Sequence, residues 1–153
     1  MKPSRTDEAS MRAALRLLSD PNEDVPVAAL LLDERGEVIA GAINDRLGSN
    51  DPTAHAEVSV LRAAGEVRGN WRLDGCTLVV TLEPCPMCAG AAVTARIDRL
   101  VFGAWNADYG ACGSVFDIPR DRRITHRPEV VGGVLAEECQ QVLTAFFGDR
   151  RTQ

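Results

Sequence analysis

The stretch that organises this chain is CTLVVTLEPCPMCAGAAVTA, residues 76–95. Its first part, residues 76–81, is a short run rich in β-branched side chains, which predicts a central strand. Its last part, residues 89–95, consists of small residues, which predicts a closely packed helix. Pro86 suits the first turn of that helix, so Cys85 falls at or near the N-cap and Cys88 lies three residues later on the same face.

Strands and helices alternate on both sides of this stretch, which predicts a three-layer α/β/α sandwich around a central five-stranded mixed sheet. The sequence does not indicate whether the final strands run parallel. We expect one domain over residues 1–153, because no repeat or long polar linker divides the chain. The other predicted elements are a helix around residues 11–18, hairpin strands at 25–32 and 38–44, a helix from 51 to about 65, strands at 99–103 and 130–131, and a helix over 135–147.

Composition and charge exclude several classes of protein. The 153 residues are 45% hydrophobic and 25% charged, as in ordinary globular domains. The longest apolar run, residues 25–32, is far shorter than the ~20 residues of a membrane span, and the start of the chain lacks the apolar stretch of a signal peptide. We therefore expect a cytoplasmic protein with no membrane partner. The net charge of −5 provides no global attraction to phosphates, so a nucleic-acid partner would need a local patch.

One basic stretch and several aromatic residues are candidates for such a patch. Residues 120–127 hold four arginines and His126 against Asp121, and Arg150-Arg151 forms a second small cluster. Single-stranded loops are commonly held by arginines and by aromatic side chains on which bases stack. An arginine run can equally be a solvated face, and both interpretations stay open. The available aromatic residues are Trp105, Tyr109, Phe146 and Phe147.

The cysteines and one histidine predict a metal site. Five cysteines without a secretion signal, two of them in C-x-x-C spacing, favour metal or redox chemistry over disulfides. His55 with Cys85 and Cys88 forms a nitrogen and sulfur ligand set that suits Zn²⁺. Three ligands leave a tetrahedral position open for water, as in catalytic zinc sites, and zinc lowers the pKa of such water to ~7. Glu57 would then be the general base and acid.

The spacing of His55 and Glu57 constrains where they lie. In a regular helix the two side chains would point ~200° apart, so we expect both in the first turn of their helix, where they can converge. Two alternatives to a catalytic zinc remain. A thioredoxin-like redox pair would leave His55-Ala56-Glu57 unexplained, and a structural zinc would need a fourth ligand from Cys76, Cys112, Cys139 or His126. Buried free cysteines usually act as small hydrophobic residues, and we assign no role to His126.

The pattern H-x-E followed by P-C-x-x-C is the known signature of zinc nucleobase deaminases. The sequence resembles, in particular, the bacterial tRNA-specific adenosine deaminases of the cytidine/deoxycytidylate deaminase-like superfamily. The likeness extends over about residues 25–151 in the family's order. It is carried by DPTAHAE at 51–57, TLEPCPMCAGA at 81–91, VFGA at 101–104, GACGS at 110–114 and the ending at 133–151.

This resemblance implies a cytidine-deaminase-like fold, a homodimer, one Zn²⁺ per subunit, and hydrolysis of adenosine to inosine at the wobble position of a tRNA anticodon stem-loop. It also implies site residues. His55, Cys85 and Cys88 would hold zinc, Glu57 would move protons, and Asn44 and Ala56 would contact the flipped base.

The chain departs from the family at two positions. The family tends to carry an acid and a lysine where this sequence has Asn106 and Asp108, in a loop that resembles one contacting RNA. Two other functions therefore stay open. One is a free-base or nucleoside deaminase acting on guanine or cytosine, which shares both metal motifs. The other is a non-catalytic, zinc-held nucleic-acid binding module, which would not need Glu57.

Overall fold

The computed structural model describes residues 2–151, without the side chains of Arg150 and Arg151. The basic pair at 150–151 therefore lies outside the described side chains. The elements are α1 (Arg5–Arg16), a short 3₁₀ turn (Leu17–Ser19), β1 (Ala28–Leu32), β2 (Val38–Ile43), α2 (Arg46–Ser49), α3 (Ala56–Arg68), β3 (Thr77–Leu82), α4 (Pro86–Thr94), β4 (Arg99–Ala104), β5 (Glu129–Val131) and α5 (Ala136–Arg151).

The five strands form one mixed sheet in the order β2-β1-β3-β4-β5. β1 runs antiparallel to both of its neighbours, β2 and β3. β3, β4 and β5 run parallel, which settles the orientation of the final strands. Because β1, β3 and β4 are buried between helices on both faces, their sequences are nearly continuous apolar runs rather than alternating ones.

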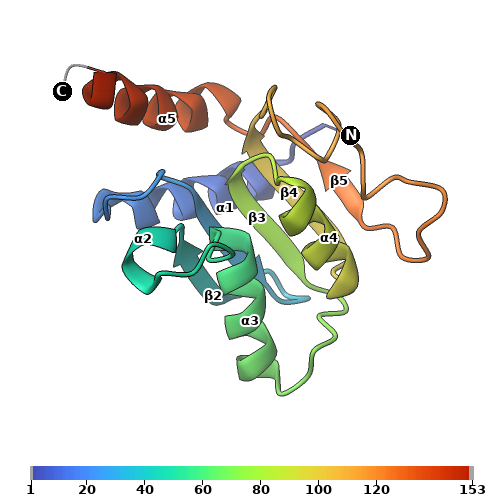
Figure 1. Cartoon of the computed structure of the whole chain (residues 1–153). Helices are drawn as coiled ribbons and strands as arrows, with labels where there is room; N and C mark the ends of the chain where they lie inside the picture. Colours follow the sequence, from blue (N-terminus) through green and yellow to red (C-terminus); the bar gives the residue numbers. More distant parts are fainter. Residues whose placement is uncertain (1, 152–153) are drawn as a thin grey trace.

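Helices cover both faces of this sheet (Figure 1). α3 packs on β1 and β2, and α4 lies beside α3. On the opposite face, α1 packs on β1 and β3, and α5 packs on β4. The three-layer α/β/α prediction is therefore confirmed. None of the helices within residues 2–151 combines the length and the apolarity that crossing a bilayer requires.

The region before α3 differs from the prediction. The sequence predicted a helix start at Asp51-Pro52-Thr53, but Asp51 Oδ1 accepts hydrogen bonds from the backbone N–H and the hydroxyl of Thr53, at 2.8 and 2.7 Å, and forms a turn instead. A short side chain that bonds its own neighbouring backbone competes with helix formation in this way. α3 begins at Ala56, with His55 as its N-cap. The short helix α2, just upstream, was not predicted.

The end of α3 also lies beyond the predicted residue. The helix passes through Gly65 and stops at Gly69, which adopts a left-handed conformation with φ +64°. Gly65 costs about 1 kcal/mol relative to alanine inside a helix, and burial of the apolar face of α3 outweighs that cost. Gly69 ends the helix because glycine takes a positive φ without strain.

Candidate active site

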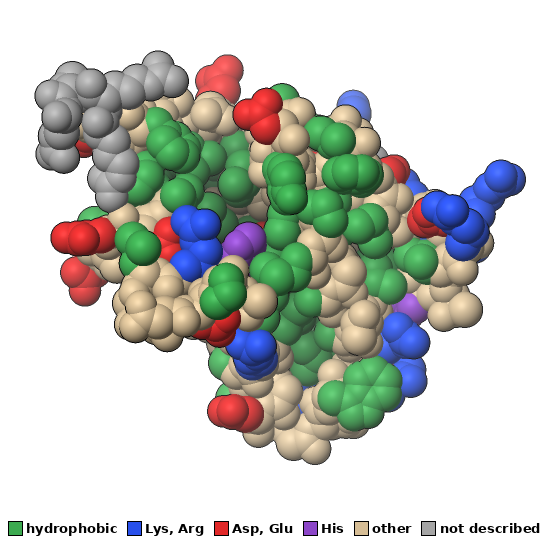
Figure 2. Space-filling model, in the orientation of Figure 1, with side chains coloured by type: hydrophobic (Ala, Val, Ile, Leu, Met, Phe, Trp, Pro, Cys, Tyr) green, Lys and Arg blue, Asp and Glu red, His purple; other side chains and the backbone are tan. Residues whose placement is uncertain are grey.

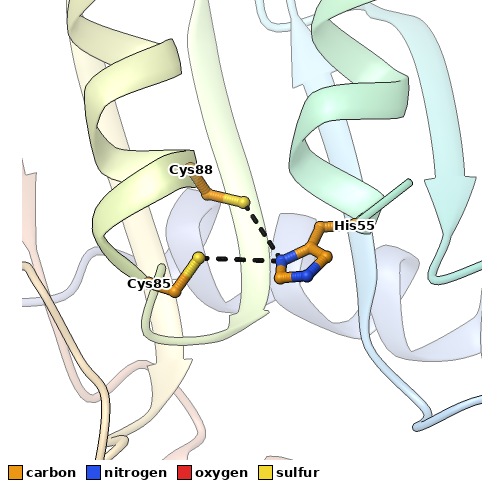
Figure 3. Close-up of side chains that lie close together, drawn as sticks. All are labelled: His55, Cys85 and Cys88. Carbon is orange, nitrogen blue, oxygen red and sulfur yellow. Dashed lines mark hydrogen bonds between the residues drawn. The ribbon is translucent and has the colours of Figure 1, made fainter. Parts of the chain in front are cut away.

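Three side chains from the starts of two helices converge at one point (Figure 3). His55 is the N-cap of α3, Cys85 is the N-cap of α4, and Cys88 lies in the first turn of α4. The Sγ atoms of Cys85 and Cys88 lie 3.6 and 3.4 Å from His55 Nδ1. All three ligand atoms lie within 4.8 Å of one another, so a single ion can contact all of them.

The donor chemistry of this group fits zinc. One imidazole nitrogen and two sulfurs are ligands that Zn²⁺ prefers. A hydrogen bond from Cys88 lowers the pKa of Cys85 to about 5, although burial opposes this shift. The same hydrogen bond, together with burial, raises the pKa of Cys88. One thiolate is therefore ready at neutral pH, and the second proton leaves when a metal binds.

The other candidate ligands lie elsewhere in the part of the chain that the structure describes. The metal-binding group consists of three residues and includes none of the remaining cysteines or His126. Cys139 faces Gly103 between α5 and β4, and His126 Nε2 contacts the backbone oxygen of Ile97 at 2.6 Å. This arrangement fits an open catalytic zinc site better than a closed structural one.

Glu57 lies beside the three ligands, in the first turn of α3, as the spacing predicted. Its side chain is buried, with 4% of the residue exposed, and it lines the same cavity as His55 and Cys85. Burial is the main cause that raises the pKa of Glu57 to about 7. A carboxyl group that titrates near neutral pH can both accept and return a proton there.

The cavity in front of these groups has a volume of about 180 Å³. Asn44, which follows β2, lines this cavity, and its contact with a base stays a prediction. Ala56 does not line the cavity, because its side chain belongs to the hydrophobic core. Any contact between Ala56 and a substrate would therefore involve its backbone. The complete lining is Val25, Val27, Asn44, Arg46, His55, Glu57, Leu82, Glu83, Cys85, Asn106 and Tyr109.

Asp24 is a buried carboxylate that no sequence pattern indicated, and it organises one wall of this cavity. Asp24 accepts hydrogen bonds from the backbone N–H and the guanidinium of Arg46, both at 2.6 Å. It also lies 3.5 Å from the side-chain nitrogen of Asn44. Burial alone would raise the pKa of Asp24, but the bonds from Arg46 and the backbone lower it to about 2. Asp24 thus holds both Asn44 and Arg46 in place.

Glu83 belongs to the motif at residues 81–91, but no sequence pattern indicated which groups its side chain would bind. This buried side chain accepts hydrogen bonds from the backbone N–H groups of Asn106, Cys112 and Ser114, each at 3.0 Å, and from the Ser114 hydroxyl. One carboxylate therefore ties the loop after β4 to the segment that carries the cysteine ligands. The only signal in the sequence was its place directly before Pro84.

The arginine stretch at 120–127 is less basic in the structure than in the sequence. Arg120 pairs with Asp117 at 2.9 Å, and Arg123 pairs with Asp121 at 2.6 Å. The stretch belongs to the long loop before β5, which projects from the edge of the sheet (Figure 1). Its residues do not line the cavity. RNA contact by this stretch stays a prediction.

The family model described as the cytidine and deoxycytidylate deaminase zinc-binding region matches residues 4–104. The chain belongs to this deaminase family. It is 44% identical over 147 residues to the tRNA-specific adenosine deaminase of Bacillus subtilis (strain 168), covering 95% of this chain and 91% of the relative.

Two solved structures resemble this deaminase along most of their length. One comes from a study of A-to-I editing by tRNA:A34 deaminases at the wobble position of transfer RNA. It has a TM-score of 0.81 and 38% identity, covering 91% of this chain and all of the other. The second is the guanine deaminase of Nitrosomonas europaea, with a TM-score of 0.76 and 27% identity over 97% of this chain and 86% of the other.

Proposed function

We propose that this deaminase converts adenosine to inosine at the wobble position of a tRNA anticodon. The observation that carries the proposal is the convergence of His55, Cys85 and Cys88 with the buried Glu57 in one cavity. The 44% identity to a tRNA-specific adenosine deaminase favours this substrate over free guanine, since the guanine deaminase is only 27% identical.

The chemistry divides among a few side chains. His55, Cys85 and Cys88 would hold one Zn²⁺, which supplies Lewis-acid activation of water at neutral pH when it is bound. Glu57 takes the proton of the water that attacks the six-carbon of adenine. It then returns that proton to the nitrogen that leaves as ammonia, so one water is consumed for each amine released.

Asn44 and Ala56 would orient the base. The Asn44 amide carries two donor hydrogens and one acceptor oxygen. Asp24 lies within reach of its nitrogen, so the Asn44 oxygen and the second hydrogen remain for a base edge. Ala56 is the first residue of α3, and backbone N–H groups at that end of a helix have no partner within the helix.

The cavity also favours a single unpaired nucleotide as the substrate. Its 180 Å³ suits one base, so a base in a nucleic-acid strand would have to leave its stack to reach Glu57. Bases in an anticodon loop are unpaired, which keeps the cost of this movement low. An anticodon stem-loop is therefore the partner that we propose.

We also propose a cytoplasmic homodimer that pairs through α3 and α4. Large exposed apolar patches commonly mark protein interfaces. Hydrophobic side chains gather on the face of the molecule that carries these helices (Figure 2). A cavity of about 680 Å³ lies there, between Leu61, Trp71 and Ala91, and both Val67 and Trp71 are exposed. Trp71→Asp should shift the protein toward monomer in light scattering, and an unchanged mass would exclude this face.

The test of function is incubation of the zinc-loaded protein with an anticodon stem-loop carrying a wobble adenosine, beside free guanine, cytosine and cytidine. Inosine and ammonia should form from the RNA. Ammonia from a free base or nucleoside alone would support the rival deaminase, and zinc binding without turnover on any substrate would support the binding module. RNA affinity should fall as salt rises, because phosphate contacts release counterions.

Glu57→Ala separates catalysis from folding. The variant should keep its zinc content and melting temperature, while turnover falls by about 10²–10⁴-fold, the usual contribution of a positioned acid or base. Glu37→Ala, at an exposed acid, is the matched control and should keep full activity. Unaltered turnover in Glu57→Ala would remove Glu57 from the mechanism.

A further inference from the structure

The loop after β4 places one exposed aromatic ring at the mouth of the catalytic cavity. Tyr109 is 62% exposed and lines the cavity beside Asn106. Phe116, in the same loop, is 52% exposed but does not line the cavity. Trp105 is half-exposed, and its ring packs edge-on against Phe102 with the centroids 4.9 Å apart. Among these exposed rings, Tyr109 alone faces the space that receives substrate.

Asn106 fixes the turn that carries Tyr109. Its side-chain oxygen accepts a hydrogen bond from the Tyr109 N–H at 3.1 Å, and its backbone oxygen accepts one from Gly110 N–H at 2.8 Å. The side-chain oxygen of Asn106 is thus already bonded within the loop. Asn106 therefore acts here as a turn residue that presents Tyr109.

Glu83 fixes the position of the turn at residues 106–110 relative to the metal ligands. It holds the backbone on both sides of Tyr109, through Asn106 N–H before it and Cys112 N–H after it. Its carboxylate lies directly against Gly110, where a Cβ atom would meet Glu83 Cδ at 2.3 Å. Because Glu83 immediately precedes Pro84 and Cys85, the Tyr109 backbone is held in a defined place beside the metal site.

The charge of this turn indicates which part of a nucleotide it meets. Asp108, next to Tyr109, is exposed and has no basic partner among the ion pairs of the described residues. A carboxylate repels phosphate, so this turn does not suit a backbone contact. An aromatic ring suits the face of a base, and a tyrosine loses little conformational freedom on binding because it has few rotatable bonds.

A base that leaves its stack also exposes its neighbour. When the target adenosine enters the cavity, an adjacent base loses one stacking partner, and an aromatic side chain at the cavity mouth can replace it. Tyr109 suits that contact because its ring lies exposed at the cavity and its backbone is held by Asn106 and Glu83.

We propose that Tyr109 is a specificity-determining residue that stacks on a base adjacent to the target adenosine in the RNA loop, with Asn106 and Glu83 as its positioning residues. This inference rests on the proposed function. Tyr109 then recognises the single-stranded RNA loop by contacting a base, while the neighbouring Asp108 disfavours contact with a phosphate.

The test compares steady-state kinetics of zinc-loaded wild type, Tyr109→Ala and Tyr109→Phe on the anticodon stem-loop. Tyr109→Ala should raise KM by about 5- to 150-fold, the range expected for loss of one base–aromatic stack, and leave kcat within about twofold. Tyr109→Phe keeps the ring and should behave as wild type. Phe116→Ala, a matched change outside the cavity, should leave KM unchanged. Zinc content and melting temperature should be equal in all variants.

Stem-loops with an abasic site on either side of the wobble adenosine identify the stacked base. At the correct position, removal of the base should raise the wild-type KM, and Tyr109→Ala should then add no further penalty. Equal KM for wild type and Tyr109→Ala on the intact stem-loop would overturn the proposal, as would a full penalty on both abasic substrates. If wild type forms no inosine from the stem-loop, the proposed function fails first, and this inference fails with it.

Discussion

Replacing Glu83 by glutamine tests whether one carboxylate supports the loop after β4. Oε1 accepts from Asn106 N–H and from the Ser114 hydroxyl, while Oε2 accepts from the N–H groups of Cys112 and Ser114. A glutamine has one oxygen and one NH₂ group. The NH₂ group is tolerated best in place of Oε1, because the Ser114 hydroxyl can rotate to accept from it, whereas a backbone N–H cannot.

The expected cost follows from this geometry. Glu83→Gln loses the bond from Asn106 N–H and removes the negative charge that strengthens the others. A hydrogen bond to a charged group contributes about 1.5–3 kcal/mol. Since Asn106 is only partly buried, water replaces some of its lost bond. We expect the free energy of unfolding to fall by about 2–3 kcal/mol, which corresponds to roughly 5–10 °C in melting temperature for a domain of this size.

Chemical denaturation of the zinc-loaded protein measures this cost, with Glu37→Gln as the control. Glu37 is exposed at the end of a turn, so its neutralisation should change stability by less than about 0.5 kcal/mol. Hydrogen exchange locates the effect: the amides of Asn106, Cys112 and Ser114 should lose protection before the strands do. Stability equal to wild type, or unchanged protection of these three amides, would refute the support that we assign to Glu83.

Three further results are expected. Asp24→Asn should lower the free energy of unfolding at neutral pH by up to about 2 kcal/mol, because folding lowers the pKa of Asp24 from 3.8 to about 2. The stability difference from wild type should persist above pH 4 and shrink toward pH 2, which acid denaturation of both proteins measures. Gly103→Ala should cost about 1–3 kcal/mol in urea denaturation, since its Cβ would lie 2.4 Å from Cys139 Sγ. Removing zinc with a chelator should abolish activity. Zinc affinity should rise with pH when the ion is added back, because the pair of Cys85 and Cys88 must lose the proton that it shares. Calorimetry in two buffers measures the protons released, and an affinity that does not change with pH would contradict this expectation.

Local sequence patterns were sufficient to predict those features that depend on neighbouring residues. The hairpin, the central strand and the cysteine-bearing helix start were correctly predicted from residue spacing and turn residues. The convergence of His55 with Cys85 and Cys88 was predicted from ligand chemistry, and the structure places the three within reach of one ion. The predicted start of α3 was wrong, because Asp51 accepts hydrogen bonds from Thr53 in a turn and does not cap the helix.

The groups around the site were beyond sequence reasoning for a physical reason. Asp24 and Glu83 act through hydrogen bonds to residues more than twenty positions away in the chain, and a lone acid shows no periodicity that would reveal such partners. Asp24 and Glu83 are buried only because the sheet and the loop after β4 pack around them in the folded chain.

The amino-acid sequence by itself determined the order of the strands and of the longer helices, the identity of the metal ligands and the family, because these depend on side-chain chemistry and short spacings. Only the tertiary structure decided that Glu57 is buried, that Asp24 holds Asn44 and Arg46, and that Tyr109 stands at the cavity mouth. Burial and long-range hydrogen bonds are properties of the packed chain, since each requires surfaces that separate segments form together.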